Sequence, residues 1–193
     1  MNKPVLEYTC QHTCAKSQKA YLLERAPFSS KIKKGRNNKN RVPFLGEGYY
    51  FWEENIQAAH RWGSIHYKGN YSVIEFENLS LNHNFLLDFL DRRSSSYFRE
   101  LKKEYIQKNK KVFGSFKLGQ WIEFFKKLNK EGKIIFRYKY FRAVENVMGD
   151  INDYDNEKVN FSTDGKYYTY LSPLNIICFV DKHDITCKNK KVI

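Results

Sequence analysis

The strongest constraint on the fold is a nearly continuous apolar run close to the C-terminal end of the sequence, Asn175-Ile176-Ile177-Cys178-Phe179-Val180. Such runs are typical of strands that are covered on both faces, whereas strands with one face in water alternate apolar and polar residues. The run therefore predicts a strand in the middle of a sheet. Because 193 residues is an ordinary single-domain length, we expect one domain, residues 1–193, built around this sheet.

Other segments rich in β-branched and aromatic residues predict further strands. These segments lie at 5–9, 49–52, 71–76 and 133–138, with shorter ones at 160–161 and 167–170. A helix is expected to begin at Glu53 and Glu54, because carboxylates stabilise the positive end of a helix, and to stop near Gly63.

The stretch from about residue 82 to about residue 129 has a helical pattern instead. Apolar residues recur there at intervals of three and four positions, which places them on common helix faces. One predicted face comprises Phe85, Leu86, Phe89 and Leu90, and another comprises Leu118, Trp121, Ile122, Phe125 and Leu128. Together the patterns predict an α+β fold in which a mixed sheet has flanking helices and a helical insertion at about 82–129.

The chain is strongly basic, with 34 Lys and Arg against 21 Asp and Glu and a formal net charge of +13. Much of this positive charge lies in two clusters. One of them, from Arg99 to Lys117, falls in the helical stretch. Such clusters are either solvated faces or sites for an acidic partner, and nucleic acid fits because phosphate neutralisation alone provides affinity. The other cluster is a predicted loop that also contains glycine and asparagine. Its basic residues are Lys31, Lys33, Lys34, Arg36, Lys39 and Arg41.

The four cysteines, Cys10, Cys14, Cys178 and Cys187, are expected to be reduced thiols. The sequence has neither an apolar run of signal-peptide length nor the cysteine density of a disulfide-held scaffold. No segment has membrane-spanning length, so we expect a soluble, cytoplasmic protein without a membrane partner. Cys10, His12 and Cys14 have side chains of the zinc-ligand type, but the second closely spaced pair of a structural zinc site is missing. We therefore expect no metal.

The segment from Gly46 to Phe51 has two glycines before an aromatic strand. Two glycines let the chain turn sharply or approach a ligand closely. Taken alone, the segment also fits a hairpin turn followed by core aromatics. A dinucleotide-binding strand-turn-helix unit does not fit, because there the glycines lie between a strand and a helix.

The whole stretch from Leu45 to Gly63 resembles the second motif of the ADP-ribosyltransferases related to diphtheria toxin and the poly(ADP-ribose) polymerases, especially their small bacterial members. In that family a Gly-x-Gly turn leads into a strand whose tyrosine stacks on nicotinamide. The resemblance implies that Tyr50 is this tyrosine, that Tyr49 occupies the variable position before it, and that Gly46 and Gly48 support the NAD pocket.

The family's first motif is a strand that ends in a histidine, followed by a residue whose backbone binds the nicotinamide carboxamide. His12 and Thr13 match it in order and distance, although the family usually has glycine where this chain has Thr13. The resemblance implies that His12 binds the nicotinamide-side ribose. The alternative is a histidine that is hydrogen-bonded for structural reasons at the end of a strand.

The third motif is a strand near the C-terminus that begins with the catalytic glutamate. By position, Asn175 occupies that place, and asparagine keeps the hydrogen bonds of a carboxylate without its charge. Glu145 is the alternative catalytic residue. The structural alternatives are a cap or turn role for Asn175 and a surface pair between Glu145 and Arg142.

The resemblance implies a split mixed sheet and an NAD-dependent mono-ADP-ribosyltransferase with NAD as co-substrate. The basic loop from Lys31 to Arg41 is expected to contact the NAD pyrophosphate or the acceptor. The charge favours RNA or DNA as acceptor, and a protein acceptor stays open. By analogy, the protein would be an intracellular bacterial toxin restrained by an antitoxin protein. The rival functions are a non-catalytic nucleic-acid-binding module and a basic nuclease, for which the sequence lacks an acidic metal cluster.

Overall fold

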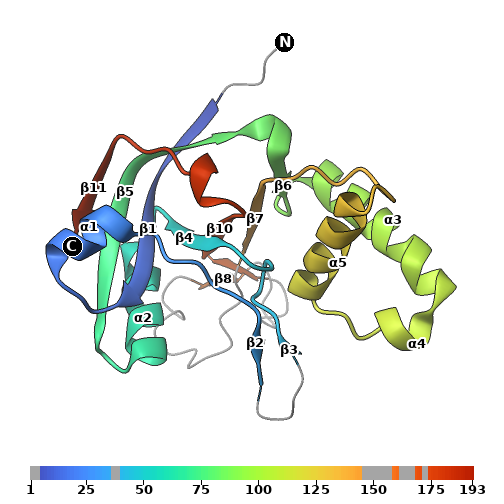
Figure 1. Ribbon diagram of the computed structural model, residues 1–193, viewed down its shortest axis with the longest axis horizontal. Coiled ribbons are helices and arrows are strands. Elements are labelled where there is room, and N and C mark those ends of the chain that lie inside the picture. The colour runs from blue at the N-terminus through green and yellow to red at the C-terminus, as the bar shows by residue number, and fades with distance from the viewer. Residues whose placement is uncertain (1–4, 36–39, 145–157, 161–167, 171–173) are drawn as a thin grey trace.

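The structure, a computed structural model, describes residues 5–35, 40–144, 158–160, 168–170 and 174–193. Its core is a mixed seven-stranded sheet with the order β11-β5-β1-β4-β10-β7-β6 (Figure 1). Neighbouring strands are antiparallel except for the parallel pair β6 and β7. The strands are β1 (Val5–Ala15), β4 (Tyr49–Glu53), β5 (Tyr71–Asn82), β6 (Leu86–Asp88), β7 (Tyr140–Val144), β10 (Asn175–Phe179) and β11 (Asn189–Val192).

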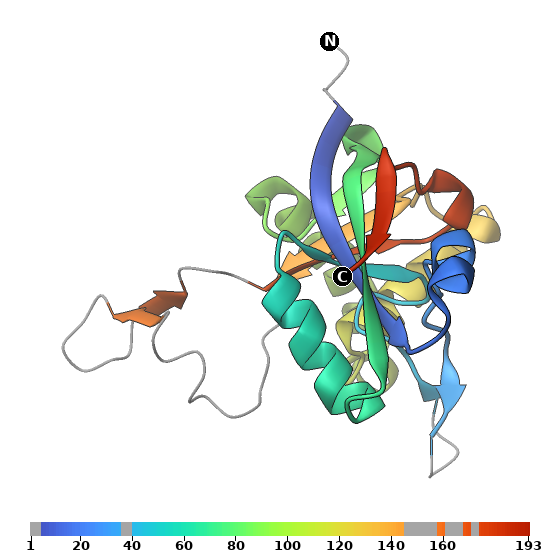
Figure 2. The same ribbon diagram turned by 90° about the vertical axis from the view of Figure 1, so that its left-hand side faces the viewer.

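Helices cover both faces of this sheet. On one face lie α2 (Ile56–Tyr67), α3 (Arg92–Lys108) and α5 (Leu118–Lys130), with the short α4 (Lys110–Phe113) between the last two. The other face is covered in part by α1 (Lys19–Arg25). Figure 2 shows α1 and α2 on opposite sides of β1 and β5. Two small hairpins lie outside the sheet, one of β2 (Lys33–Lys34) and β3 (Asn40–Arg41), the other of β8 (Lys158–Asn160) and β9 (Tyr168–Tyr170).

The apolar run near the C-terminus forms an interior strand, as its pattern predicts. Strand β10 pairs with β4 on one side and with β7 on the other. Ile177 and Phe179 belong to the apolar cluster on the α1 face, and Cys178 belongs to the cluster on the α2 face. Because both faces are covered, alternation is not needed along this strand. The α+β class and the mixed sheet are confirmed.

The sheet is nearly divided between β1 and β4. Only two residue pairs join these strands, Cys10 with Glu53 and Gln11 with Trp52. Beyond Gln11, β1 continues along β5 as far as Ala15, whereas the earlier residues of β4 pair with β10. The two halves of the sheet therefore separate at this point.

The predicted bounds of the helix after β4 are wrong at both ends. Glu53 is the last residue of β4, and the Oδ1 of Asn55 accepts a hydrogen bond of 2.8 Å from the Ala58 N–H to begin α2. The helix also continues through Gly63 to Tyr67. A Cβ atom at Gly63 would collide with the ring of Tyr71, so glycine serves close helix–strand packing here rather than helix termination.

The predicted helical insertion is correct only from α3 onward. Residues 83–85 form a 3-10 turn, and Leu86–Asp88 forms β6 beside β7. Leu86 and Leu87 are buried in the clusters on opposite faces of the sheet, as neighbours in a strand are, so the first predicted helix face does not exist. The second face is confirmed, since Trp121, Ile122, Phe125 and Leu128 are the buried side chains of α5, beside Gly119.

The strand predicted at 133–138 is also wrong. The strand in this region is β7, which begins at Tyr140. Phe136 is buried against the helices, whereas Ile135 is 76% exposed, so the apolar residues of 133–138 serve a connection rather than the sheet.

Candidate functional site

His12 lies on β1 just beyond the last residue pair with β4. Its Nδ1 is 2.9 Å from the carbonyl oxygen of Tyr50, and its Nε2 is 3.1 Å from the backbone nitrogen of Phe28. Because the Phe28 N–H can only donate, Nε2 is the acceptor, and the proton resides on Nδ1. The imidazole therefore donates to Tyr50 and connects the two strands where their ladder ends.

The imidazole is held neutral. His12 is 4% exposed and packs against the rings of Phe28 and Phe51, at centroid distances of 6.2 and 5.7 Å. Burial lowers the pKa of His12 to about 4, opposed by the hydrogen bond to Tyr50 and assisted by the charge of Lys182. In this arrangement the ring acts as a hydrogen-bonding group and not as a cation.

The depressed pKa predicts an acid sensitivity that originates at His12. As the pH falls below 6.5, the unfolded chain takes up a proton that the folded protein accepts only near pH 4, so the folded state loses stability through this window. Between about pH 7.5 and about pH 5 the loss should be about 2 kcal/mol. Urea unfolding of the wild type and His12→Asn at both pH values measures it. Equal pH dependence of the two proteins would contradict a neutral, buried His12.

Tyr50 closes the glycine turn that precedes it. Its hydroxyl donates to the carbonyl of Gly46 at 2.6 Å and accepts from the Leu45 N–H at 2.8 Å. Burial raises the pKa of the Tyr50 hydroxyl, so it stays protonated. The ring is partly buried on the α2 face of the sheet, with half-buried Trp62 in the same apolar cluster.

The two glycines allow the turn to approach other segments closely. Gly46 has a φ of +81°, which favours glycine, and a Cβ there would collide with the carboxylate of Glu123 on α5. The same carboxylate accepts a hydrogen bond of 2.8 Å from the Glu47 N–H. A Cβ on Gly48 would collide with the backbone carbonyl of Phe179 on β10. The turn is therefore clamped between α5 and the centre of the sheet.

His12 and Tyr50 project to opposite faces of the sheet. The His12 ring packs with Phe51 in the α1-face cluster, and Tyr50 packs in the α2-face cluster. Tyr49 lies beside the α1-face cluster, on the same face as His12. Thr13 projects toward α2, where its hydroxyl donates to the carbonyl of Ala59 at 2.8 Å. The structure thus brings the two motifs together through a backbone carbonyl rather than through facing side chains.

Asn175 begins β10 and shares a sheet face with His12. It pairs with Val144 of β7, and alternation along β10 puts it on the side of Ile177 and Phe179. Its Oδ1 is buried, and within the described residues no donor reaches it. Tyr50 pairs with Cys178, three positions further along β10, so Asn175 and Tyr50 are not adjacent.

A partly buried ion cluster that the sequence does not predict lies on the same face. Arg142 donates from Nε and Nη2 to the two carboxylate oxygens of Glu53, each at 2.6 Å, and from Nη1 to Asp88 at 3.2 Å. Its guanidinium also lies 5.6 Å from the ring centroid of Tyr8. Glu145, the expected partner of Arg142 and alternative catalytic residue, lies outside the described residues. The partners that the structure describes are 89 and 54 positions from Arg142, so no local pattern reveals them.

The basic loop forms the β2–β3 hairpin, which extends from the glycine turn. Ser30 and Gly48 exchange two backbone hydrogen bonds, of 2.7 and 3.1 Å, and the Glu47 carboxylate accepts from the Ile32 N–H at 2.7 Å. Arg36 and Lys39 lie outside the described residues. The described basic side chains of the hairpin are all exposed: Lys31, Lys33, Lys34 and Arg41.

The cysteines are free thiols, and Cys10, Cys14 and Cys178 are buried. Burial raises the pKa of Cys14 to about 11 and that of Cys178 to about 12, so both are protonated near neutral pH. Within the part of the chain that the structure describes, no group of three or more His, Cys, Asp or Glu could hold a metal ion. Among the same residues no helix is long and apolar enough to cross a membrane.

Comparison of the chain with protein-family models, with curated proteins and with solved structures finds no match.

Proposed function

We propose that the protein is an NAD-dependent ADP-ribosyltransferase that binds NAD where β1 and β4 separate. The observation that carries this proposal is the 2.9 Å hydrogen bond between His12 Nδ1 and the Tyr50 carbonyl at the end of the β1–β4 ladder. It joins the residues that resemble the first and second family motifs. The finer fold assignment, an ADP-ribosyltransferase-like split sheet, is part of the same proposal, supported by the two-pair connection between the sheet halves.

The chemistry of the site suits cleavage of the nicotinamide–ribose bond. That bond breaks through an oxocarbenium-like state, and nicotinamide leaves as a neutral group, so no strong general acid is required. Neutral His12 offers hydrogen bonding on one face of the sheet and protonated Tyr50 an aromatic ring on the other, and neither is such an acid. In the structure Nε2 of His12 accepts from Phe28, so a ribose hydroxyl would replace this donor.

Asn175 supplies a further argument. Among the described residues no donor reaches the buried Oδ1 of Asn175, such an acceptor is costly to leave unpaired, and a ribose hydroxyl is a donor of the right kind. Asparagine in place of the family glutamate offers a hydrogen bond but no negative charge. Charge stabilisation of the transition state is therefore smaller at this position than with a carboxylate.

The acceptor that we propose is nucleic acid, RNA or DNA. The exposed cations of the β2–β3 hairpin extend from the same glycine turn that Tyr50 closes, so an acidic polymer bound there would lie next to the NAD pocket. A protein acceptor is the alternative outcome of the experiment below.

NAD labelled in its adenylate group tests the proposal. We expect label in the nucleic-acid fraction of a cell extract, together with release of nicotinamide. His12→Asn keeps a donor for the Tyr50 carbonyl but removes Nε2, and it should slow turnover on the order of 100-fold, the effect of one lost transition-state hydrogen bond. Label in protein alone would reassign the acceptor. No label in any fraction and no nicotinamide release would refute the activity.

A second function, a non-catalytic nucleic-acid-binding module on the same fold, has specific support. Both nitrogens of His12 are hydrogen-bonded within the chain, and Asn175 is an asparagine where the resemblance implies a catalytic glutamate. In that case oligonucleotides would bind while NAD is neither bound nor cleaved. The labelling experiment and a direct NAD-binding titration separate the two functions.

A further inference from the structure

We infer that α4 and the start of α5 carry a second nucleic-acid contact, which extends the β2–β3 hairpin into one binding surface for a single strand. The inference rests on the proposed function only in taking this strand to be the acceptor. The binding itself is independent of NAD. We call the exposed residues Lys108, Lys110, Lys111 and Lys117 the tip lysines.

The charge of the helical unit is concentrated at this tip. From residue 92 to residue 133 the sequence has thirteen Lys and Arg against four Asp and Glu. No acidic residue occurs between Glu104 and Glu123, the interval that contains all tip lysines. This local excess of one sign attracts polyanions.

The tip lysines also lack ionic partners within the described residues. The salt bridges of the helical unit use other lysines: Lys103 with Glu100, Lys126 with Glu123, and Lys127 and Lys133 with Glu131. Lys108 lies over the ring of Tyr105, 5.0 Å from its centroid, which leaves its charge uncompensated. Phosphate groups would provide the missing counter-charge.

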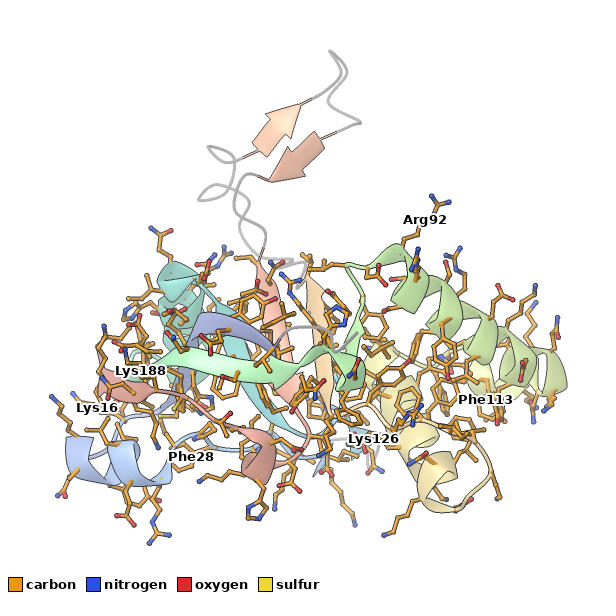
Figure 3. The ribbon with its side chains drawn as sticks, turned by 90° about the horizontal axis from the view of Figure 1, so that it is seen from above. Lys16, Phe28, Arg92, Phe113, Lys126 and Lys188 are labelled. Atoms are coloured by element: carbon orange, nitrogen blue, oxygen red, sulfur yellow. The ribbon has the colours of Figure 1, made fainter. Side chains whose placement is uncertain are left out.

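Packing holds the tip in one orientation. The Oδ1 of Asn109 accepts from the Val112 N–H at 3.2 Å and caps α4. Phe113 then inserts among the aromatic side chains of the unit, with its ring 5.5 Å from Trp121 and 5.3 Å from Phe116. Phe113, labelled in Figure 3, is therefore partly buried, whereas Lys110 and Lys111 of the same short helix are exposed.

The tip and the hairpin are mechanically connected. Gly119 at the start of α5 lies so close to the carbonyl of Pro43 that a Cβ would collide with it, and Lys117 precedes this contact by two residues. Pro43 lies two residues after the end of β3 at Arg41. In Figure 1 the β2–β3 hairpin projects downward from the middle of the molecule, and α4 lies to its right, beyond α5. The two sets of cations therefore flank one junction.

An exposed aromatic residue occupies this junction. Phe44 is 40% exposed, although the next residue, Leu45, is completely buried. The backbone carbonyl of Phe44 lies against Gly119. A base can stack on such a ring only when it is free of a duplex. Cations on both sides of a single stacking platform fit single-stranded nucleic acid better than a duplex.

Fluorescence anisotropy with oligo(U) RNA and oligo(dT) DNA of about 20 nucleotides, without NAD, tests the inference. The triple variant K110Q/K111Q/K117Q should lower the slope of log K against log salt by about 2 and weaken binding on the order of 100-fold at about 0.1 M salt. The matched variant K16Q/K19Q/K188Q makes the same charge change at exposed lysines on the α1 side, labelled in part in Figure 3, and should change the slope little.

Phe44→Leu tests the stacking platform. It should weaken single-strand binding about tenfold but leave binding of a blunt duplex of equal length unchanged. Equal losses from the two triple variants would overturn the inference, as would equal effects of Phe44→Leu on single strands and duplex. Binding that depends on the tip lysines without NAD turnover would refute only the proposed catalysis. Labelling of nucleic acid without this dependence would refute only the second contact.

Discussion

Replacing Tyr50 with leucine is expected to lower kcat/KM for nicotinamide release from NAD on the order of 100-fold, whereas phenylalanine should keep activity within about tenfold of the wild type. The proposed role of Tyr50 is stacking of its ring on nicotinamide, which phenylalanine retains. The hydroxyl is already used by Gly46 and Leu45 to close the turn. Steady-state assays of both variants measure the difference.

Stability measurements complete this test. Tyr50→Phe leaves the Leu45 N–H and the Gly46 carbonyl without their partner and should cost about 1–3 kcal/mol of unfolding free energy. Tyr138→Leu makes the same change at another half-buried tyrosine and should leave kcat/KM unaltered. Equal losses of activity in Tyr50→Phe and Tyr50→Leu would show that Tyr50 acts only by closing the turn.

Replacing Arg142 with methionine is expected to produce the largest loss of stability, about 3 kcal/mol. The side chains of Arg142, Glu53 and Asp88 are only 18%, 9% and 15% exposed. Without the guanidinium, two carboxylates remain close together in a poorly solvated site. Their residual contact with water places the expected loss at the lower end of the range for buried ion pairs. Chemical unfolding at neutral pH measures it.

Two further variants test whether the ion cluster is the cause of this loss of stability. Arg137→Met removes an exposed arginine of the preceding connection and should change stability by no more than about 0.5 kcal/mol. Arg142→Lys keeps the charge but loses the two-pronged contact with Glu53, so its loss should be intermediate. If Arg142→Met were as stable as Arg137→Met, the cluster would not connect β4, β6 and β7 as the structure indicates.

Local sequence patterns predict some helices and strands correctly and others wrongly. The apolar run of β10 and the apolar face of α5 were predictable because each depends on the period of its own backbone and on burial. Residues 86–90 misled the helix prediction, because intervals of three and four also occur when a short strand adjoins a turn. The pattern at Gly63 predicts a helix stop, although close packing against Tyr71 is the reason for glycine there.

Some features of the candidate site are likewise predictable from the sequence and others are not. The glycine turn and its aromatic strand are visible in the sequence because they are contiguous. The engagement of both His12 nitrogens, the buried Oδ1 of Asn175 and the partners of Arg142 are not. Each depends on which distant strand lies alongside and in which register, and a shift of one residue would exchange the two faces.

The sequence by itself therefore determined the α+β class, the buried central strand, the excess of positive charge and the residue types available for the proposed NAD site. Only the tertiary structure decided that β1 and β4 separate beyond Gln11, that His12 and Tyr50 face opposite sides of the sheet, and that exposed Phe44 lies against Gly119 at the start of α5. The physical reason is range: periodicity and turn chemistry act over a few residues, whereas strand pairing and side-chain packing join segments that lie far apart in the chain.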